Sequence, residues 1–148
     1  MIVRDAAADE RGALEALQRR ASDVWEEYCA ALAAHPDAIA LAPDLIAAGC
    51  VRVAVSDDGE VLGFSVLLAP RDGVCELDGL FVEPEAIGGG VGRALIADAA
   101  TRARAAGAMR ISVIANQRAV GFYERLGFVA GEPATTRFGP AAWMHLAL

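Results

Sequence analysis

Residue types that build disulfides and metal sites are scarce in this chain of 148 residues. Its three cysteines, Cys29, Cys50 and Cys75, are odd in number and lack C-x-x-C spacing, which argues against a disulfide framework or a cysteine zinc site and indicates a reducing compartment. The two histidines, His35 and His145, lie far apart without an H-E-x-x-H pattern, so a zinc hydrolase has little support. We therefore expect a domain that folds without a metal or a disulfide.

Positive charge is also in short supply. The chain has 13 Lys and Arg against 20 Asp and Glu, a formal net charge of −7. A field of this sign repels nucleic acid and anionic membranes and attracts a cationic or amine substrate. No apolar run approaches the ~20 residues of a membrane span, and Arg4 and Asp5 stand where a signal peptide would need its apolar core. We expect a cytoplasmic protein without a nucleic-acid or membrane partner.

Hydrophobic periodicity predicts the order of the elements, and the length suits one domain over residues 1–148. Strands are expected at 2–3, 50–56, 61–69, 74–82, 110–115, from 128 onward, and at 143–148. Between the last two we expect a polar, Pro-containing connection. Helices are expected as two pieces between 6 and 34, the second beginning at Ser22, and then at 45–48, 91–106 and 116–126, the last capped by Asn116.

A glycine-rich turn separates an apolar strand from an alanine-rich helix, and its glycines are Gly88, Gly89, Gly90 and Gly92. Such a turn exposes backbone N–H groups at the positive end of the helix dipole, which favours a phosphate group. A P-loop would need Gly-Lys-Ser/Thr, but this turn ends Gly92-Arg93-Ala94. A dinucleotide fingerprint would need its third glycine at Arg93 or Leu95. Neither nucleotide-binding motif fits.

A longer pattern surrounds this turn: Leu80-Phe81-Val82-Glu83-Pro84, Gly88-Gly89-Gly90-Val91-Gly92-Arg93-Ala94-Leu95, Asn116, Ala119 and Phe122-Tyr123-Glu124-Arg125-Leu126-Gly127-Phe128. Through these residues the chain resembles the GNAT superfamily of acyl-CoA-dependent N-acyltransferases. The resemblance implies a mixed α/β fold whose central sheet is mostly antiparallel, splayed at its centre and flanked by helices. It also implies acetyl-CoA as the co-substrate.

The resemblance assigns acetyl-CoA to one set of residues: Leu80, Phe81, Val82, Gly88, Gly89, Gly90, Val91, Gly92, Arg93, Asn116 and Tyr123. Backbone amides from Gly88 to Arg93 are expected to hold the pyrophosphate, and the backbone of 80–82 is expected to pair with the pantetheine arm as an added strand would. The chain departs from the family pattern at Ile87, where Gln or Arg is usual. Because the backbone does most of the binding, we expect this change to matter little.

Two side chains are the candidates for proton transfer. Tyr123 is expected to protonate the departing CoA thiolate as a general acid; its alternative role is that of a core aromatic. Glu76 is expected to act as the base toward the amine, with Asp78 on the same strand face. Both carboxylates could instead be solvated strand residues, with water relays as the base. No cysteine or serine stands in a recognisable nucleophile motif, which favours direct attack by the amine.

The acceptor is expected to be a small-molecule amine or the amine of a peptide or protein. The sequence is compatible with a homodimer. The resemblance indicates Trp25, Tyr28 and Asp78 as substrate contacts, although the two aromatics could simply pack on the sheet. Arg137, Phe138 and Trp143 are candidates for the opposite wall. Two other classes of protein are weighed against the enzyme: a non-catalytic acyl-CoA sensor, which would not need Tyr123 as a proton donor, and an interaction protein with no affinity for CoA.

Overall fold

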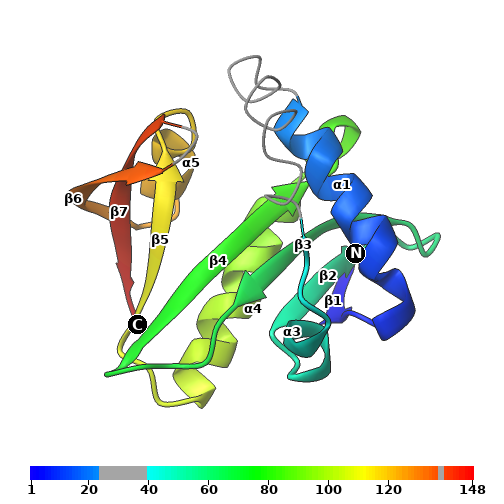
Figure 1. The fold of residues 1–148 in the computed structure, drawn as a ribbon, viewed down its shortest axis with the longest axis horizontal. Coiled ribbons are helices and arrows are strands. Elements are labelled where there is room, and N and C mark those ends of the chain that lie inside the picture. Colours follow the sequence, from blue (N-terminus) through cyan, green and yellow to red (C-terminus); the bar gives the residue numbers. More distant parts are fainter. Residues whose placement is uncertain (24–39, 137–138) are drawn as a thin grey trace. The chain divides into compact units, whose positions relative to one another are not determined.

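The computed structural model describes residues 1–23, 40–136 and 139–148 (Figure 1). Along the chain the elements are β1 (Ile2–Asp5), the 3₁₀ helix η1 (Ala8–Glu10), α1 (Arg11–Asp23), α3 (Pro43–Ala47), β2 (Val51–Val55), β3 (Val61–Leu67), β4 (Val74–Val82), the 3₁₀ helix η3 (Pro84–Ala86), α4 (Val91–Ala105), β5 (Arg110–Asn116), α5 (Val120–Arg125), β6 (Val129–Thr136) and β7 (Gly139–Ala147). None of these helices is long and apolar enough to cross a membrane.

The strands form one seven-stranded sheet with the order β1-β2-β3-β4-β5-β7-β6. Antiparallel pairing joins β1 to β2, β2 to β3, β5 to β7 and β6 to β7. β4 and β5 run parallel, and their ladder extends from Val74 opposite Arg110 to Leu77 opposite Val113. The expected mixed, mostly antiparallel sheet is confirmed, and the parallel ladder at its centre is short.

The chain divides into two compact units, which are described separately. Unit 1 comprises Met1–Val66 and Gly79–Ile96, and unit 2 comprises Leu67–Asp78 and Ala97–Leu148. Both β4 and α4 contribute one part of their length to each unit. The glycine-rich turn therefore belongs to unit 1, and α5 belongs to unit 2.

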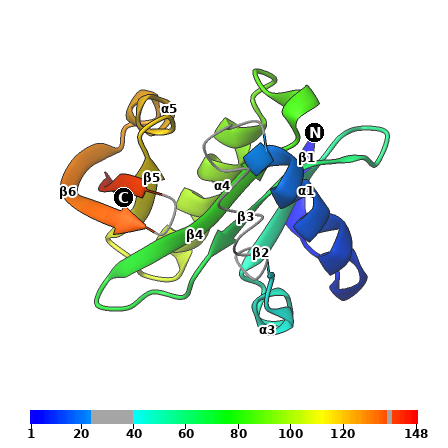
Figure 2. The same cartoon turned by 45° about the horizontal axis from the view of Figure 1, so that its top comes forward.

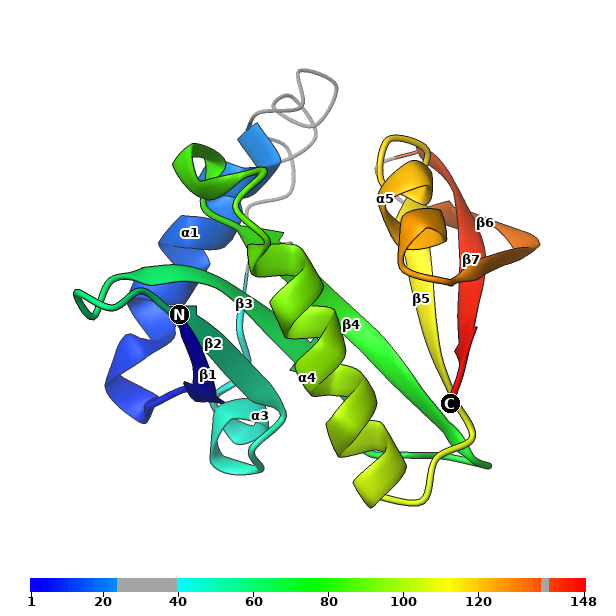
Figure 3. The ribbon, with the colours of Figure 1, turned by 180° about the vertical axis from the view of Figure 1, so that it is seen from behind.

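In unit 1, helices cover both faces of the first strands. α1 lies in front of β1–β3 in Figure 1, and the first turns of α4 lie in front of the sheet in the view from behind (Figure 3). Val91 and Leu95 of α4 are buried against Ala54 of β2. Since burying one such aliphatic side chain stabilises a fold by ~1.5–3 kcal/mol, this contact fixes the beginning of α4 on the sheet.

Gly63 of β3 allows a close approach within this core. A Cβ atom at Gly63 would lie 2.7 Å from the carbonyl oxygen of Phe81 and 3.0 Å from Cγ1 of Val91. No side chain fits in that space, because the nearest atom belongs to the backbone. Gly63 thus lets β4 and the start of α4 pack tightly on β3.

In unit 2, β5 is paired with β7 along its whole length, from Arg110 opposite Ala147 to Asn116 opposite Ala141. α5 contacts β5 and β6, and these elements lie together in Figure 2. The buried residues of this unit include Ile111 on β5 and Met144 on β7. This paired core supports the side chains on both faces of β5.

The C-terminal strands are longer than predicted. We expected a polar connection between short strands, but β6 extends through Thr136 and β7 begins at Gly139. Proline is tolerated here because β6 is the edge strand of the sheet and Pro133 borders a register shift. At an edge, a missing N–H removes no bond from the interior of the ladder.

Two predicted helix boundaries also differ. The helix expected from Asn116 begins at Val120, because residues 117–119 form a turn before it. α1 continues through Ser22 and Asp23, where a second helix was expected to begin. The rest of that second helix lies outside the described residues. Other predicted elements agree well, and the strand predicted at 74–82 has the bounds of β4.

Gly63→Ala should lower the free energy of unfolding by roughly 1–3 kcal/mol, because the new methyl group overpacks the core. Gly12→Ala is the matched control: no atom lies within 4 Å of a Cβ at this position of α1, and alanine favours a helix by up to about 1 kcal/mol over glycine. Urea unfolding of both variants measures the difference. Equal stabilities would contradict the close packing around Gly63.

Candidate active site

Gly88, Gly89 and Gly90 of the glycine-rich turn are exposed to solvent, whereas Val91 and Gly92 at the start of the helix are buried. Gly88 and Gly90 have φ angles of 90° and 83°, which only glycine adopts without strain, and no atom lies within 4 Å of a Cβ built on either. The first bond of the helix runs from the N–H of Ala94 to the carbonyl oxygen of Gly90, at 3.0 Å. The N–H groups of Val91 and Gly92 precede it and have no acceptor in the helix. This geometry suits an anion.

One amide of the turn is already used. The N–H of Gly89 donates to the carbonyl oxygen of Ala86 at 3.1 Å and so closes a turn after η3. The groups available to a phosphate are therefore those of Gly88, Gly90 and the first turn of α4. Ile87, at the position where the family usually has Gln or Arg, has 63% of its surface exposed.

An ion pair holds the chain that leads into this turn. Arg20 of α1 donates two hydrogen bonds to the carboxylate of Glu83, from Nε at 2.7 Å and from Nη2 at 2.8 Å. These bonds lower the pKa of Glu83. The N–H of Glu83 also donates to the carbonyl oxygen of Leu62 on β3. Sequence reasoning missed this pair, since no spacing signal links residues 63 positions apart.

The end of β4 leads directly to the turn. The parallel ladder of β4 with β5 ends at Leu77, so Leu80–Val82 lie beyond its last pair. Leu80 and Val82 pack against the cluster of Val91 and Leu95, while Phe81 lies with its ring 5.2 Å from that of Phe64. The side chains thus fix this backbone segment within unit 1.

Tyr123 is packed as a core aromatic, which was the alternative role considered for it, and its role as an acid stays a prediction. The side chain is only 6% exposed, and its ring makes edge contacts with Phe122 and Phe128 at centroid distances of 5.1 and 5.2 Å. It is therefore a core aromatic of unit 2. Burial also raises the pKa of its phenol, so the hydroxyl keeps its proton at neutral pH and can act as a donor.

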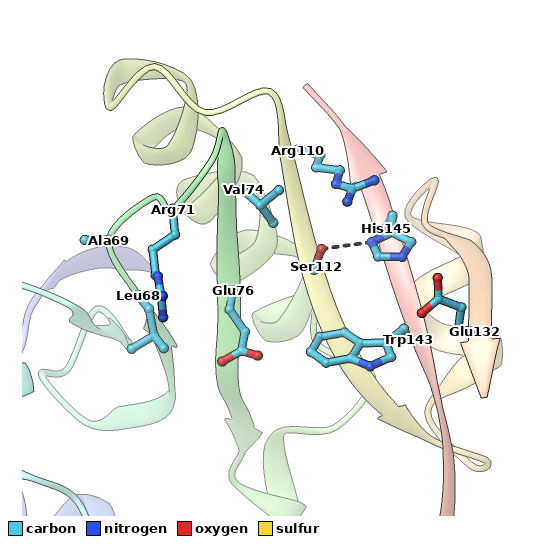
Figure 4. Close-up of a pocket in the computed structure, with 10 residues that line it drawn as sticks. All are labelled: Leu68, Ala69, Arg71, Val74, Glu76, Arg110, Ser112, Glu132, Trp143 and His145. Atoms are coloured by element: carbon cyan, nitrogen blue, oxygen red, sulfur yellow. Dashed lines mark hydrogen bonds between the residues drawn. The ribbon is translucent and has the colours of Figure 1, made fainter. Parts of the chain in front are cut away.

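Glu76 lies at a cavity of about 480 Å³ in unit 2 (Figure 4). The cavity is lined by alternate residues of neighbouring strands, because Glu76 is opposite Ser112 on β5 and Ser112 is opposite His145 on β7. Burial raises the pKa of Glu76, and the nearby Asp78 carboxylate raises it further. The predicted pairing of these carboxylates on one strand face is thereby supported. Asp78 and Tyr123 are not among the residues that line the cavity.

Sequence reasoning did not find two features of this cavity. The Oγ of Ser112 lies 2.8 Å from Nδ1 of His145, a hydrogen bond that fixes the imidazole ring. Arg110, at the start of β5, also lines the cavity. A lone serine or histidine on a strand carries no spacing signal, so only the cross-strand register could reveal this group. Trp143 lines the cavity as well, and its place in a wall of the substrate site stays a prediction.

Asn116 was expected to be the N-cap of the helix, but the N-cap of α5 is Ala119. The Oδ1 of Asn116 accepts hydrogen bonds from the N–H groups of Arg118 and Ala119, both at 3.0 Å. Because α5 begins only at Val120, Asn116 caps the turn that precedes the helix. Its contact with acetyl-CoA stays a prediction. The other candidates for substrate contact, Trp25, Tyr28, Arg137 and Phe138, lie outside the described residues.

Comparison with known proteins establishes the family. The family model of the acetyltransferase (GNAT) family matches residues 12–128. The chain therefore belongs to the GNAT family and is an acyltransferase. A curated relative, the peptidyl-lysine N-acetyltransferase YjaB of Salmonella typhimurium, is 30% identical over 126 residues, which cover 85% of this chain and 81% of the relative.

Solved structures share the fold along the whole chain. The PaiA N-acetyltransferase of Thermoplasma acidophilum, crystallised in complex with coenzyme A, superposes with a TM-score of 0.82 at 17% identity, covering 99% of this chain and 98% of that one. Apo-form YjaB of Escherichia coli superposes with a TM-score of 0.73 at 24% identity, covering 99% and 97%. At these identities the likeness shows the fold alone.

Asp78→Asn should lower the pKa of Glu76, because it removes the negative charge that opposes ionisation. Titration of the Glu76 side-chain carboxyl carbon by ¹³C NMR, in the parent and in the variant, measures the change. Glu60→Gln is a control that removes an exposed carboxylate elsewhere and should leave the Glu76 curve in place. An unchanged curve in Asp78→Asn would show that burial alone sets this pKa.

Proposed function

We propose that the protein transfers an acetyl group from acetyl-CoA to a primary amine by direct attack of the amine on the thioester. The observation that carries this proposal is the glycine-rich turn, whose free N–H groups open the 15-residue helix α4. Within the GNAT family this turn is the element expected to bind the cofactor pyrophosphate. The proposal uses three groups of residues: those that hold acetyl-CoA, a base and an acid.

Backbone groups hold the acetyl-CoA. The amides of Gly88, Gly90 and 91–93 bind the pyrophosphate, which gains from the positive end of the α4 dipole. The pantetheine arm lies along the backbone of Leu80–Val82 as an added strand. Glycine is needed at Gly88 and Gly90 both for their positive φ angles and because a side chain there would occupy the space over the turn. Acetyl-CoA itself supplies the thioester carbonyl that the amine attacks.

Glu76 takes the proton from the incoming amine. Its raised pKa brings this carboxylate nearer to the working pH, where a general base is most effective. The position supports the assignment, since Glu76 lies at a cavity large enough for a small ligand. Asp78 assists by raising the pKa of Glu76.

Tyr123 returns a proton to the leaving sulfur. The phenol is protonated at neutral pH, which is the form that a general acid requires, although burial raises its pKa and so makes it a weaker donor. A covalent mechanism through a cysteine has less support, because Cys75 is 1% exposed and burial raises the pKa of its thiol. A buried neutral thiol is a poor nucleophile. Direct attack therefore accounts better for the residues present.

The acceptor is a basic amine. The net charge of −7 draws protonated amines toward the protein, and the Salmonella relative is named for the acetylation of peptidyl-lysine. We propose a lysine-like alkyl amine, free or within a peptide, as the acceptor class.

Gly90→Ala should weaken acetyl-CoA binding. At saturation near 100 times its Kd, acetyl-CoA should add ~2.7 kcal/mol of stability to the parent, and a thermal shift assay should show a smaller gain for the variant. Gly59→Ala is the matched control, because Gly59 has a φ of 86° and equally open space but lies in the β2–β3 turn. Both variants lose stability through strain, and only Gly90→Ala should lose the acetyl-CoA shift. Equal shifts in both variants would contradict the proposal that the glycine-rich turn binds the pyrophosphate.

Tyr123→Phe should reduce kcat by a factor of ~10²–10⁴, the usual contribution of a general acid. The aromatic contacts with Phe122 and Phe128 survive the change, so stability and acetyl-CoA binding should be retained. Release of free thiol from acetyl-CoA, measured over a panel of amines, gives the rate. A rate equal to that of the parent would leave Tyr123 with a packing role only.

A further inference from the structure

The cavity of unit 2 carries charges of both signs in an ordered arrangement (Figure 4). Arg71 bridges to Val74, and Val74 is opposite Arg110, so the two arginines flank Val74 in one row across the sheet. Glu76, Ser112 and His145 form another row. The two rows lie two residues apart along the strands, which corresponds to about 7 Å.

Neither guanidinium in the first row is neutralised. Arg71 and Arg110 belong to none of the ion pairs found among residues 1–23, 40–136 and 139–148. Each guanidinium offers N–H donors in a planar fork, a geometry that matches a carboxylate. The two groups lie on different sides of Val74 in Figure 4, and Glu132 also lines the cavity.

The second row is negative and also lacks a partner. Among the described residues, the charged neighbour that alters the pKa of Glu76 is Asp78, which has the same sign. Ser112 and His145 bind each other, and Ser112 lies between Glu76 and His145 in this row. Trp143 adds a flat apolar surface to the same cavity, suited to the methylene groups of an alkyl amine.

We propose that this cavity is the acceptor site and that it selects amines that also carry a carboxylate. Arg71 and Arg110 bind the carboxylate, while Glu76 receives the ammonium group and takes its proton. The inference rests on the proposed function, in which Glu76 is the base. An amine without an acid group leaves two guanidinium groups unpaired beside its own positive charge, and such a mismatch is a strong source of discrimination.

Matched acceptors test the selection directly. 6-Aminohexanoate is compared with 6-aminohexanamide, and Nα-acetyl-L-lysine with Nα-acetyl-L-lysinamide, because each pair differs only in the carboxylate. The parent should show a kcat/KM about 10- to 100-fold higher for the carboxylates, the range expected for a charged hydrogen bond. Equal values within both pairs would overturn the inference.

Variants identify the residues. The double change Arg71→Gln and Arg110→Gln should bring the ratio close to one, because the carboxylates lose their binding groups and the amides no longer meet two positive charges. Arg104→Gln removes the same charge from an exposed position of α4 outside the cavity and should keep the parent ratio. A ratio that survives in the double variant would overturn the assignment. Thermal unfolding checks that all variants fold.

Binding of the acceptor in the absence of acetyl-CoA tests the carboxylate site separately from the proposed acetyl transfer. In ¹H–¹⁵N spectra, assigned with Trp143→Phe, 6-aminohexanoate should shift the indole signal of Trp143 and its amide should not. If this shift occurs and is lost in the double arginine variant, although no amine is acetylated, the acceptor chemistry proposed above fails and the carboxylate site stands. If amines are acetylated without discrimination and the indole signal does not move, the proposed function stands and the carboxylate site fails.

Discussion

The attachment of the first turn of α4 to the sheet is the constraint on which the rest of unit 1 depends. Val91 and Leu95 are buried against Ala54, so the helix begins at a defined place and its free N–H groups have a defined direction. Gly63 makes the approach close enough, and the bonds from Arg20 to Glu83 fix the chain just before the turn. A glycine-rich turn alone would be a mobile connection. A hydrophobic contact on one side and an ion pair on the other hold it in one geometry, which would preorganise it for the proposed pyrophosphate.

Desolvation is the second physical theme, and it acts on three groups in unit 2. It raises the pKa of Glu76 toward the range of a useful base, keeps the phenol of Tyr123 protonated, and keeps the thiol of Cys75 neutral. The same effect therefore favours Glu76 as a base, makes Tyr123 a weaker acid and disfavours Cys75 as a nucleophile. This agrees with direct attack by an amine, since the chemistry then needs only proton movement at the two ends of the reaction.

Net charge and local charge lead to different conclusions about the substrate. The whole chain is acidic, which indicates a cationic ligand, whereas the cavity contains Arg71 and Arg110 in one row and Glu76 in the next. Long-range attraction depends on the sum of charges, but recognition depends on the groups within hydrogen-bond reach. A molecule with both an amine and a carboxylate satisfies the two requirements together, which an amine alone does not.

Local patterns in the sequence were enough to define the family, the bounds of β4 and the start of α4, because glycines, prolines and hydrophobic periods act over a few residues. The length of β6 was predicted wrongly, because a strand can contain Pro133 only at the edge of a sheet. Which strand is at the edge depends on the assembled sheet. The rows of residues in the cavity and the ion pair of Arg20 with Glu83 could not be predicted either, because they too depend on the assembled structure. Partners distant along the chain meet through strand register and helix packing, so tertiary structure alone decided which charges face each other and which are left without a counter-charge.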